Sequence, residues 1–288
     1  MTDSAEPSPL EILRPDYPRG PFRCVVFDFD GTLSLLRGNW QGLMIPRMVE
    51  ILAEIGTSES REALHALVAE FVTRLTGQPT MVQFEALCDE VARRGRPRPE
   101  ARRYFDEYIT RLLAQTARRI AAVQSGRVRA DDLMVPGSRQ LVERLAEAGT
   151  VVVISSGTEL AHVQAETAVL GLDLFFGSRI FGPVENDPTF SKQAVLEQLM
   201  AEHGISGSQI ACIGDGPAEI LAARAVGALA VGVASDEIDR SGSINQLKRD
   251  HLLRAGAEVI VADYREAGPI GRLLGLTEGR REGETEGC

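Results

Sequence analysis

The sequence predicts an α/β protein in which an all-helical segment interrupts a parallel sheet. Two observations lead to this fold class. Short apolar runs without alternation recur along the chain, and segments with helical spacing of apolar residues separate them. After the first run, the stretch 40–124 holds helical patterns and no convincing strand. Strands that alternate with helices form βαβ units, which bind ligands at the carboxyl ends of the strands.

The expected strands are short, apolar and rich in β-branched residues, as buried parallel strands are. They cover 23–28, 150–155, 209–214, 228–234 and 258–263, with a weaker sixth at 172–177. Helices are expected at 138–148, 158–170, 191–203, 217–226, 243–255 and 265–274. The inserted stretch carries apolar stripes at i, i+3, i+4 spacing over 44–55, 64–75, 84–91 and 108–120, which is typical of a helical bundle core.

These patterns divide the chain into four parts. Residues 21–36 and 130–276 form the α/β core, and 37–129 form the helical insertion. Residues 1–20 contain four prolines and are expected to be irregular. The polar, glycine-rich residues 277–288 are expected to be a disordered tail.

Composition limits the function classes. The chain has 288 residues, of which 44% are hydrophobic and 25% charged, as in a soluble globular protein. A net charge of -10 argues against a general binder of nucleic acid or anionic membranes, and no apolar run approaches a bilayer span. The four cysteines have no framework-like spacing, so we expect reduced thiols and a cytoplasmic location. The sequence leaves the oligomeric state open.

The first expected strand ends in two carboxylates, Asp28 and Asp30, followed directly by Gly31 and Thr32. Carboxylates this close repel each other unless a cation or a shared proton lies between them. Asp-Gly alone is most often a turn. The pair therefore indicates a site only if other polar residues gather at the same edge of the sheet.

Three further motifs supply such residues. Ser155 ends the next expected strand in VVVISSGT, Lys192 starts a helix in FSKQAVLEQL, and Asp215 follows a strand in CIGDGPAEI. Each motif is ambiguous alone. All of them occur in order, and each lies at a strand end or a helix start, so together they indicate a site. Together with the Asp28 motif they resemble the four motifs of the haloacid dehalogenase (HAD) superfamily. The resemblance covers nearly the whole chain after about residue 22.

The resemblance is to the phosphatase branch of that family, which includes phosphoglycolate phosphatase and β-phosphoglucomutase. It implies a Rossmann-like core with a helical cap inserted after the first motif. It also implies Mg²⁺ as cofactor, with Asp28 as a metal ligand and as the nucleophile that forms an aspartyl-phosphate. Asp30 would give its carbonyl to the metal, protonate the leaving group and then activate water. Asp215 would be a further metal ligand.

The same resemblance implies a phosphate-binding set. Ser155 would donate to a phosphate oxygen, Lys192 would neutralise charge, and the amide of Ser156 would be a further donor. Gly31 would permit tight backbone near the phosphate. The sequence departs from the family at Glu219, where Asp is common. The longer side chain is expected to reach the metal only through a water, or to orient Asp215 without binding the metal itself.

Residues at the start of the insertion are candidates for substrate specificity. Arg37 and Asn39 offer donors to hydroxyl groups beside Trp40, the only tryptophan. Trp40 is either part of the cap core or a platform for a sugar ring. The four histidines, His65, His162, His203 and His251, have no ligand spacing and are not expected to bind metal.

The sequence therefore predicts a magnesium-dependent phosphomonoesterase. A second Asp in the first motif fits phosphate esters, whose leaving group must be protonated. The expected substrate is a small phosphorylated metabolite, namely a sugar, cyclitol or hydroxy-acid phosphate, because a closed cap leaves little room for a polymer. The alternatives are a nucleotide phosphatase, a phosphomutase of the β-phosphoglucomutase type, and a non-catalytic regulatory module that binds metal and phosphate.

Overall fold

The computed structural model describes residues 10–75, 80–184, 190–265 and 267–276, and it has two compact units. The first unit comprises Met1–Leu33 and Met134–Cys288, and the second comprises Ser34–Leu133. The expected tail, 277–288, lies outside the described residues. No helix in the described ranges combines the length and the apolar character that a bilayer span needs.

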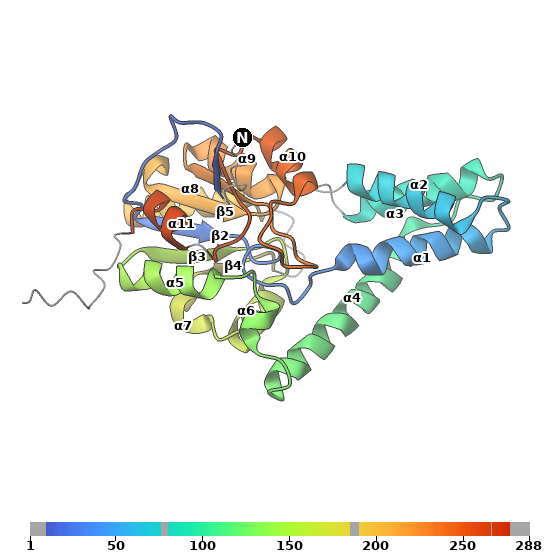
Figure 1. Ribbon diagram of the computed structural model, residues 1–288, viewed down its shortest axis with the longest axis horizontal. Coiled ribbons are helices and arrows are strands. Elements are labelled where there is room, and N and C mark those ends of the chain that lie inside the picture. The colour runs from blue at the N-terminus through green and yellow to red at the C-terminus, as the bar shows by residue number, and fades with distance from the viewer. Residues whose placement is uncertain (1–9, 76–79, 185–189, 266, 277–288) are drawn as a thin grey trace, which may run out of the picture. The chain divides into compact units, whose positions relative to one another are not determined.

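A seven-stranded sheet forms the centre of the first unit, in the order β1-β7-β6-β5-β2-β3-β4. All neighbours are parallel except β1 and β7. The strands are β1 (Leu10–Ile12), β2 (Cys24–Phe27), β3 (Val151–Ser155), β4 (Ile180–Phe181), β5 (Ile210–Gly214), β6 (Leu229–Val233) and β7 (Val259–Val261). The predicted α/β class is confirmed (Figure 1).

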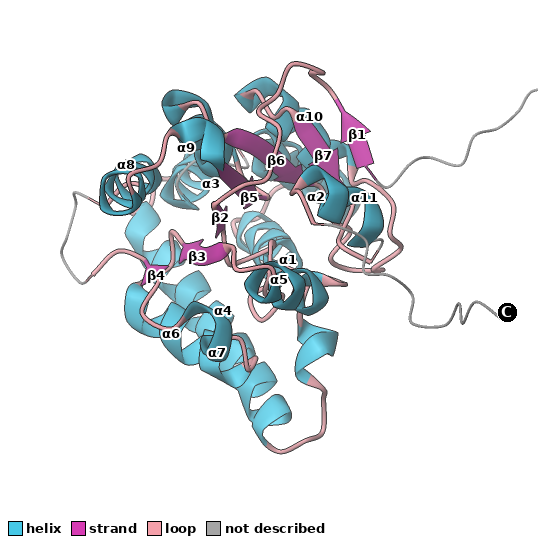
Figure 2. Cartoon of the chain, turned by 90° about the vertical axis from the view of Figure 1, so that its left-hand side faces the viewer, coloured by secondary structure: helices cyan, strands magenta, loops and turns pink. Residues whose placement is uncertain are grey.

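Helices cover both faces of this sheet, as parallel strands require. They are α5 (Ser138–Glu147), α6 (Leu160–Val169), α7 (Asp173–Phe176), α8 (Lys192–His203), α9 (Pro217–Val226), α10 (Gln246–Ala255) and α11 (Ala267–Leu273). Figure 2 shows α8, α9 and α10 on one side of the row of strands and α5 and α11 on the other.

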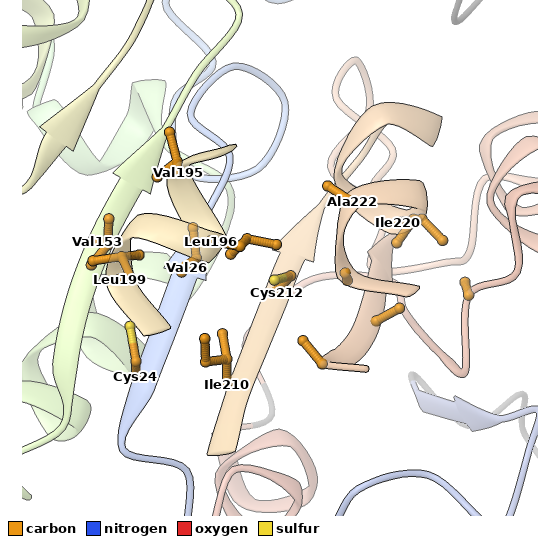
Figure 3. Close-up of a cluster of buried hydrophobic side chains, with 14 of the residues drawn as sticks. Cys24, Val26, Val153, Val195, Leu196, Leu199, Ile210, Cys212, Ile220 and Ala222 are labelled. Carbon is orange, nitrogen blue, oxygen red and sulfur yellow. The ribbon is translucent and has the colours of Figure 1, made fainter. Parts of the chain in front are cut away.

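The core on the α8 and α9 side consists of aliphatic and thiol side chains from strands and helices. Figure 3 shows Cys24 and Val26 of β2 with Cys212 of β5, facing Leu196 of α8 and Ile220 of α9. These five side chains are at most 5% exposed. Their close packing fixes the ends of the strands that carry the polar residues described below.

The second unit is a helical bundle, as its apolar stripes predict. Its helices are α1 (Trp40–Glu54), α2 (Arg61–Arg74), α3 (Thr80–Arg93) and α4 (Ala101–Gln124). Buried side chains from the predicted stripes, such as Met48, Val68 and Leu87, form one cluster. Within this unit, Arg119 Nη1 donates to the carbonyls of Leu35 and Gly38, at 3.1 and 2.8 Å, and so ties the entry segment to α4.

Two sequence predictions are wrong in detail. The segment 172–177, where a strand was expected, contains the short helix α7 instead. The strand at the edge of the sheet beside β3 is β4. Leu172 and Phe176 are buried, whereas Leu174 is 86% exposed, and this follows a helical spacing rather than the alternation of a strand. The N-terminal lead is not wholly irregular, since β1 pairs with β7 through the exposed edge that β7 would otherwise present.

Candidate active site

Three predicted site residues lie at the carboxyl ends of neighbouring parallel strands. Asp28 directly follows β2, Ser155 is the last residue of β3, and Asp215 directly follows β5. Phe27, the last residue of β2, pairs with the penultimate residue of both neighbours. The three polar side chains therefore come to one level of the sheet. This arrangement follows from the sheet order, in which β2 lies between β5 and β3.

Lys192 is brought to Asp28 by the start of α8. The hydroxyl of Ser191 accepts a hydrogen bond from the Ala194 amide at 3.1 Å, so the helix begins at Lys192. The Lys192 Nζ lies 2.5 Å from Asp28 Oδ1 and also donates to Glu219 Oε1. A buried cation thus bridges two buried carboxylates.

Glu219 is held by the start of α9. Its Oε2 accepts a hydrogen bond from the amide of Gly216, the N-cap residue, at 3.1 Å. Gly214 provides the space, since a Cβ there would lie 2.4 Å from Glu219 Cγ. Glu219 therefore has a capping role and a charge role, because its other oxygen binds Lys192.

Burial and the neighbouring charged groups shift the pKa values of the site residues. Burial raises the pKa of Asp28 well above its usual range; Lys192 opposes this, while Glu219 and Asp215 add to it. Burial alone would lower the pKa of Lys192, but Asp28 and Glu219 raise it overall, so Lys192 carries a positive charge. The site is thus an acidic pocket with a fixed cation.

Asp30 follows Asp28 on the same loop and is half-buried. Its Oδ2 accepts a hydrogen bond from Thr158 Oγ1 at 2.7 Å. Sequence reasoning missed Thr158. Its one signal is its place in the loop after Ser155, where a hydroxyl can reach back to the neighbouring strand end.

The two serines of the second motif behave differently. Ser155 Oγ is buried and has no hydrogen-bond partner among the described residues. The amide of Ser156 donates to the Phe181 carbonyl of β4 at 2.9 Å, and its hydroxyl accepts from the Thr158 amide at 3.1 Å. Ser155 thus has hydrogen-bonding capacity for a ligand, whereas Ser156 orders the loop and its amide is already engaged.

Asp215 has a lysine partner that sequence reasoning also missed. Lys248, on α10, donates from Nζ to Asp215 Oδ2 at 2.8 Å and to Glu237 Oε1 at 2.6 Å. Gly31 packs on the same carboxylate: its φ is +73°, and a Cβ there would lie 2.1 Å from Oδ2. Burial raises the pKa of Asp215, and Lys248 opposes that rise.

A small cavity lies beside Asp28. Its polar lining is Asp28, Ser155, Lys192 and Glu219, and its apolar lining includes Cys212. Within the described ranges, no three His, Cys, Asp or Glu side chains form a metal-binding group. The ligand set expected from the sequence needs only two carboxylates, with a main-chain carbonyl as the third donor.

The predicted specificity residues lie in the second unit. Arg37 and Trp40 are half-buried and Asn39 is exposed. Trp40 packs against the apolar cluster of the helical bundle. Asn39 has a φ of 60°, in the left-handed region, immediately before α1 begins.

Solved structures with the same fold come from several bacteria. A haloacid dehalogenase-like protein of Agrobacterium tumefaciens superposes with a TM-score of 0.58 and 18% identity over 86% of this chain and 97% of that one. A HAD family hydrolase of Deinococcus radiodurans, with bound phosphate and sodium, has a TM-score of 0.58 and 20% identity over 90% and 99%. For a predicted phosphoglycolate phosphatase of Haemophilus somnus the values are 0.55 and 17%, over 87% and 98%.

Sequence comparison gives the family directly. No curated protein sequence gave a match. The family model of haloacid dehalogenase-like hydrolases matches residues 22–227, which span the four motifs and the helical insertion. The chain belongs to the haloacid dehalogenase-like hydrolase family.

Proposed function

We propose that this hydrolase is a magnesium-dependent phosphomonoesterase that acts on a small phosphorylated metabolite through an aspartyl-phosphate at Asp28. The observation that carries the proposal is the buried Asp28 carboxylate, held 2.5 Å from Lys192 beside a cavity that Ser155 also lines. An attacking oxygen, a fixed cation and a hydroxyl with spare hydrogen-bonding capacity are what phosphoryl transfer requires.

The donor set fits Mg²⁺. Asp28 and Asp215 are hard oxygen donors, and the negative charge of Asp215 adds to the raised pKa of Asp28. A divalent cation bound by both, with the Asp30 carbonyl, would remove that repulsion and the repulsion between Asp28 and an incoming phosphate. Mg²⁺ is commonly held by one or two carboxylates together with water and substrate phosphate.

The remaining residues supply binding and proton transfer. Lys192 would neutralise charge on the transferred group, and its contact with Asp28 supports this role. Ser155 Oγ would donate to one of the oxygens of that group, and its lack of a hydrogen-bond partner among the described residues supports this role. Asp30, oriented by Thr158, is the group that would protonate the leaving oxygen and then take a proton from water. Gly31 packs on Asp215, so its part is to make room for that carboxylate.

The helical insertion is proposed as the cap that selects the leaving group, with Arg37, Asn39 and Trp40 as the candidate contacts. We expect a sugar, cyclitol or hydroxy-acid phosphate. The three described cysteines, Cys24, Cys88 and Cys212, are free and buried, which supports the cytoplasmic location expected from the sequence.

Release of inorganic phosphate from a panel of phosphorylated metabolites, with Mg²⁺ and with EDTA, tests this function. We expect release that needs Mg²⁺ and is lost in Asp28→Asn. Isomerised product without released phosphate would identify a phosphomutase, and preference for nucleotides would identify a nucleotide phosphatase. No turnover of any phosphate ester, with Mg²⁺ still bound, would favour a non-catalytic binding module and overturn the proposal.

A further inference from the structure

The site contains a second group of lysine and glutamate that none of the four motifs includes. Lys248 Nζ lies 2.8 Å from Asp215 Oδ2 and 2.6 Å from Glu237 Oε1. The side chain of Lys248 is 20% exposed and that of Glu237 is 14% exposed. A largely buried ion pair stabilises the folded protein only if its geometry is well defined. The contact of this pair with Asp215 therefore calls for an explanation.

This group repeats the arrangement around the proposed nucleophile. Lys192 forms ion pairs with both Asp28 and Glu219. In the same way, Lys248 forms ion pairs with both Asp215 and Glu237. In both groups the glutamate gives the lysine a second anchor. A lysine side chain is long and flexible, so the second anchor fixes where Nζ lies.

Among the described residues, Asp215 Oδ2 has a lysine partner, whereas Oδ1 has no hydrogen-bond partner. Oδ2 accepts from Lys248 and faces Gly31, where a Cβ would lie 2.1 Å from Oδ2 but 3.2 Å from Oδ1. The backbone on one side and the lysine on the other restrict rotation of the carboxylate. Mg²⁺ demands near-ideal octahedral geometry, so the orientation of each ligand oxygen matters.

We infer that Lys248, anchored by Glu237, is a positioning residue that binds Asp215 Oδ2 and thereby presents Oδ1 to the divalent cation. This inference depends on the proposed function in one respect, which is that Asp215 is a metal ligand. Outer partners of metal ligands commonly contribute a factor of about 10 to 100 in metal affinity or activity.

A different reading of the same contact predicts the opposite sign. If Lys248 acts only through its charge, it competes with the metal for Asp215, and its removal should tighten Mg²⁺ binding. If Lys248 serves only the stability of the fold, its removal should lower the melting temperature and leave the Mg²⁺ dissociation constant unchanged. Metal affinity measured without substrate therefore separates the three.

The experiment is calorimetric titration of Mg²⁺ into the full-length, metal-free protein in the absence of substrate. Lys248→Met should weaken Mg²⁺ binding about 10- to 100-fold. Lys248→Arg should recover part of the loss, and Glu237→Gln should weaken binding in the same direction by less. The melting temperature in EDTA is measured for each variant, so that Lys248→Arg and Glu237→Gln carry the test if Lys248→Met does not fold.

Arg249→Met is the matched control. Arg249 is the next residue on α10, and its Nε pairs with Glu11 Oε2 at 2.7 Å instead of with the site. Its removal should leave the Mg²⁺ affinity unchanged. In Lys248→Met, phosphate release should need more Mg²⁺ for half-maximal rate and recover most of its kcat at saturating Mg²⁺.

Unchanged or tighter Mg²⁺ binding in Lys248→Met, with wild-type binding intact, would overturn this inference and leave the proposed function standing. Absence of Mg²⁺ binding in the wild-type protein would overturn both.

Discussion

At the scale of single residues, the site depends on buried carboxylates that are stabilised by lysines. Asp28 is 8% exposed, and burial is the largest cause of its raised pKa. Ionising such a group is costly in the folded, metal-free protein. The residue that performs the proposed chemistry therefore lowers the stability of the empty enzyme, as functional residues often do.

Replacing this carboxylate gives a prediction for both activity and stability. Asp28→Asn should abolish phosphate release, because an amide is a poor nucleophile, and should raise the melting temperature of the metal-free protein at neutral pH. The folded pKa lies above the unfolded value, so the stability associated with this group is present at low pH and is lost as the pH rises through the folded pKa. The stabilising effect of the variant should shrink as the pH falls toward about 4.

Thermal denaturation in EDTA across this pH range, beside a phosphate-release assay, measures both effects. Retention of more than a few per cent of wild-type turnover would rule out Asp28 as the nucleophile.

The contact between Thr158 and Asp30 gives a second prediction. Asp30→Asn should lower the turnover of alkyl phosphates by about 100- to 10,000-fold, the usual contribution of general acid–base catalysis. The loss should be smaller for an aryl phosphate, whose leaving group needs no proton. Thr158→Val should produce the same pattern with a smaller loss, because it removes the hydrogen bond that orients Asp30.

The matched control is Thr158→Ser, which keeps the hydroxyl and should behave like the wild type. Steady-state kinetics with one alkyl and one aryl ester suffices. Equal losses on both esters in Asp30→Asn would contradict its role as the acid.

The sequence could locate the site residues that end an apolar run or belong to one of the four motifs, Lys192 among them, but not Lys248, which reaches Asp215 from within α10. Asp28, Ser155 and Asp215 each end a recognisable apolar run, and the parallel sheet brings such ends together. Lys248 lies within a helix that has a polar surface pattern, where a lysine is normally solvated. Only the packing of α10 on the sheet turns it toward Asp215, and no local pattern specifies that packing.

At the scale of elements, the buried strands were predictable and the marginal ones were not. Val231 and Val153 lie in runs that are buried on both faces, and their β-branched composition indicates a strand directly. The segment 172–177 is equally apolar, but its fold depends on whether Leu174 faces the core or the solvent. Strand β1, with three residues, exists only because β7 offers an edge for it.

The start of α9 allows the capping and charge roles of Glu219 to be separated. Glu219→Gln keeps an acceptor for the Gly216 amide but loses the charge that binds Lys192. We expect little loss of stability and a clear loss of phosphate release. Glu219→Ala loses both, and the missing cap should lower the free energy of unfolding by about 0.5–2 kcal/mol.

Denaturant unfolding and phosphate release of the two variants are compared with the wild type. If Glu219→Gln were fully active, the charge of Glu219 would have no part in holding Lys192.

At the scale of the whole molecule, the core and the helical insertion are distinct units with separate apolar clusters. The proposed division of labour assigns the phosphate to the core and the leaving group to the insertion. Variation in one unit should then change specificity without changing the chemistry.

Trp40 tests that division. Trp40→Ala and Arg37→Ala should change the ranking of substrates while the requirement for Mg²⁺ stays. Trp40 also packs on the bundle core, so some loss of stability is expected, below the about 3–5 kcal/mol of a fully buried aromatic residue. The measurements are thermal stability and kcat/KM for the best substrate and for a small aryl phosphate.

A large stability loss with an unchanged ranking would make Trp40 structural. A greater loss of kcat/KM for the preferred substrate than for the aryl phosphate would place it on the leaving group.

The central claim is that Asp28 carries the phosphoryl group, and trapping that group tests it most directly. Asp30→Asn is mixed with an aryl phosphate and Mg²⁺, because this variant should still form the aspartyl-phosphate but hydrolyse it slowly. Quenching, borohydride reduction and peptide mass spectrometry then locate the modified residue. We predict modification at Asp28, and none when Asp28→Asn is added; release of phosphate without modification at Asp28, or modification elsewhere, would contradict the account.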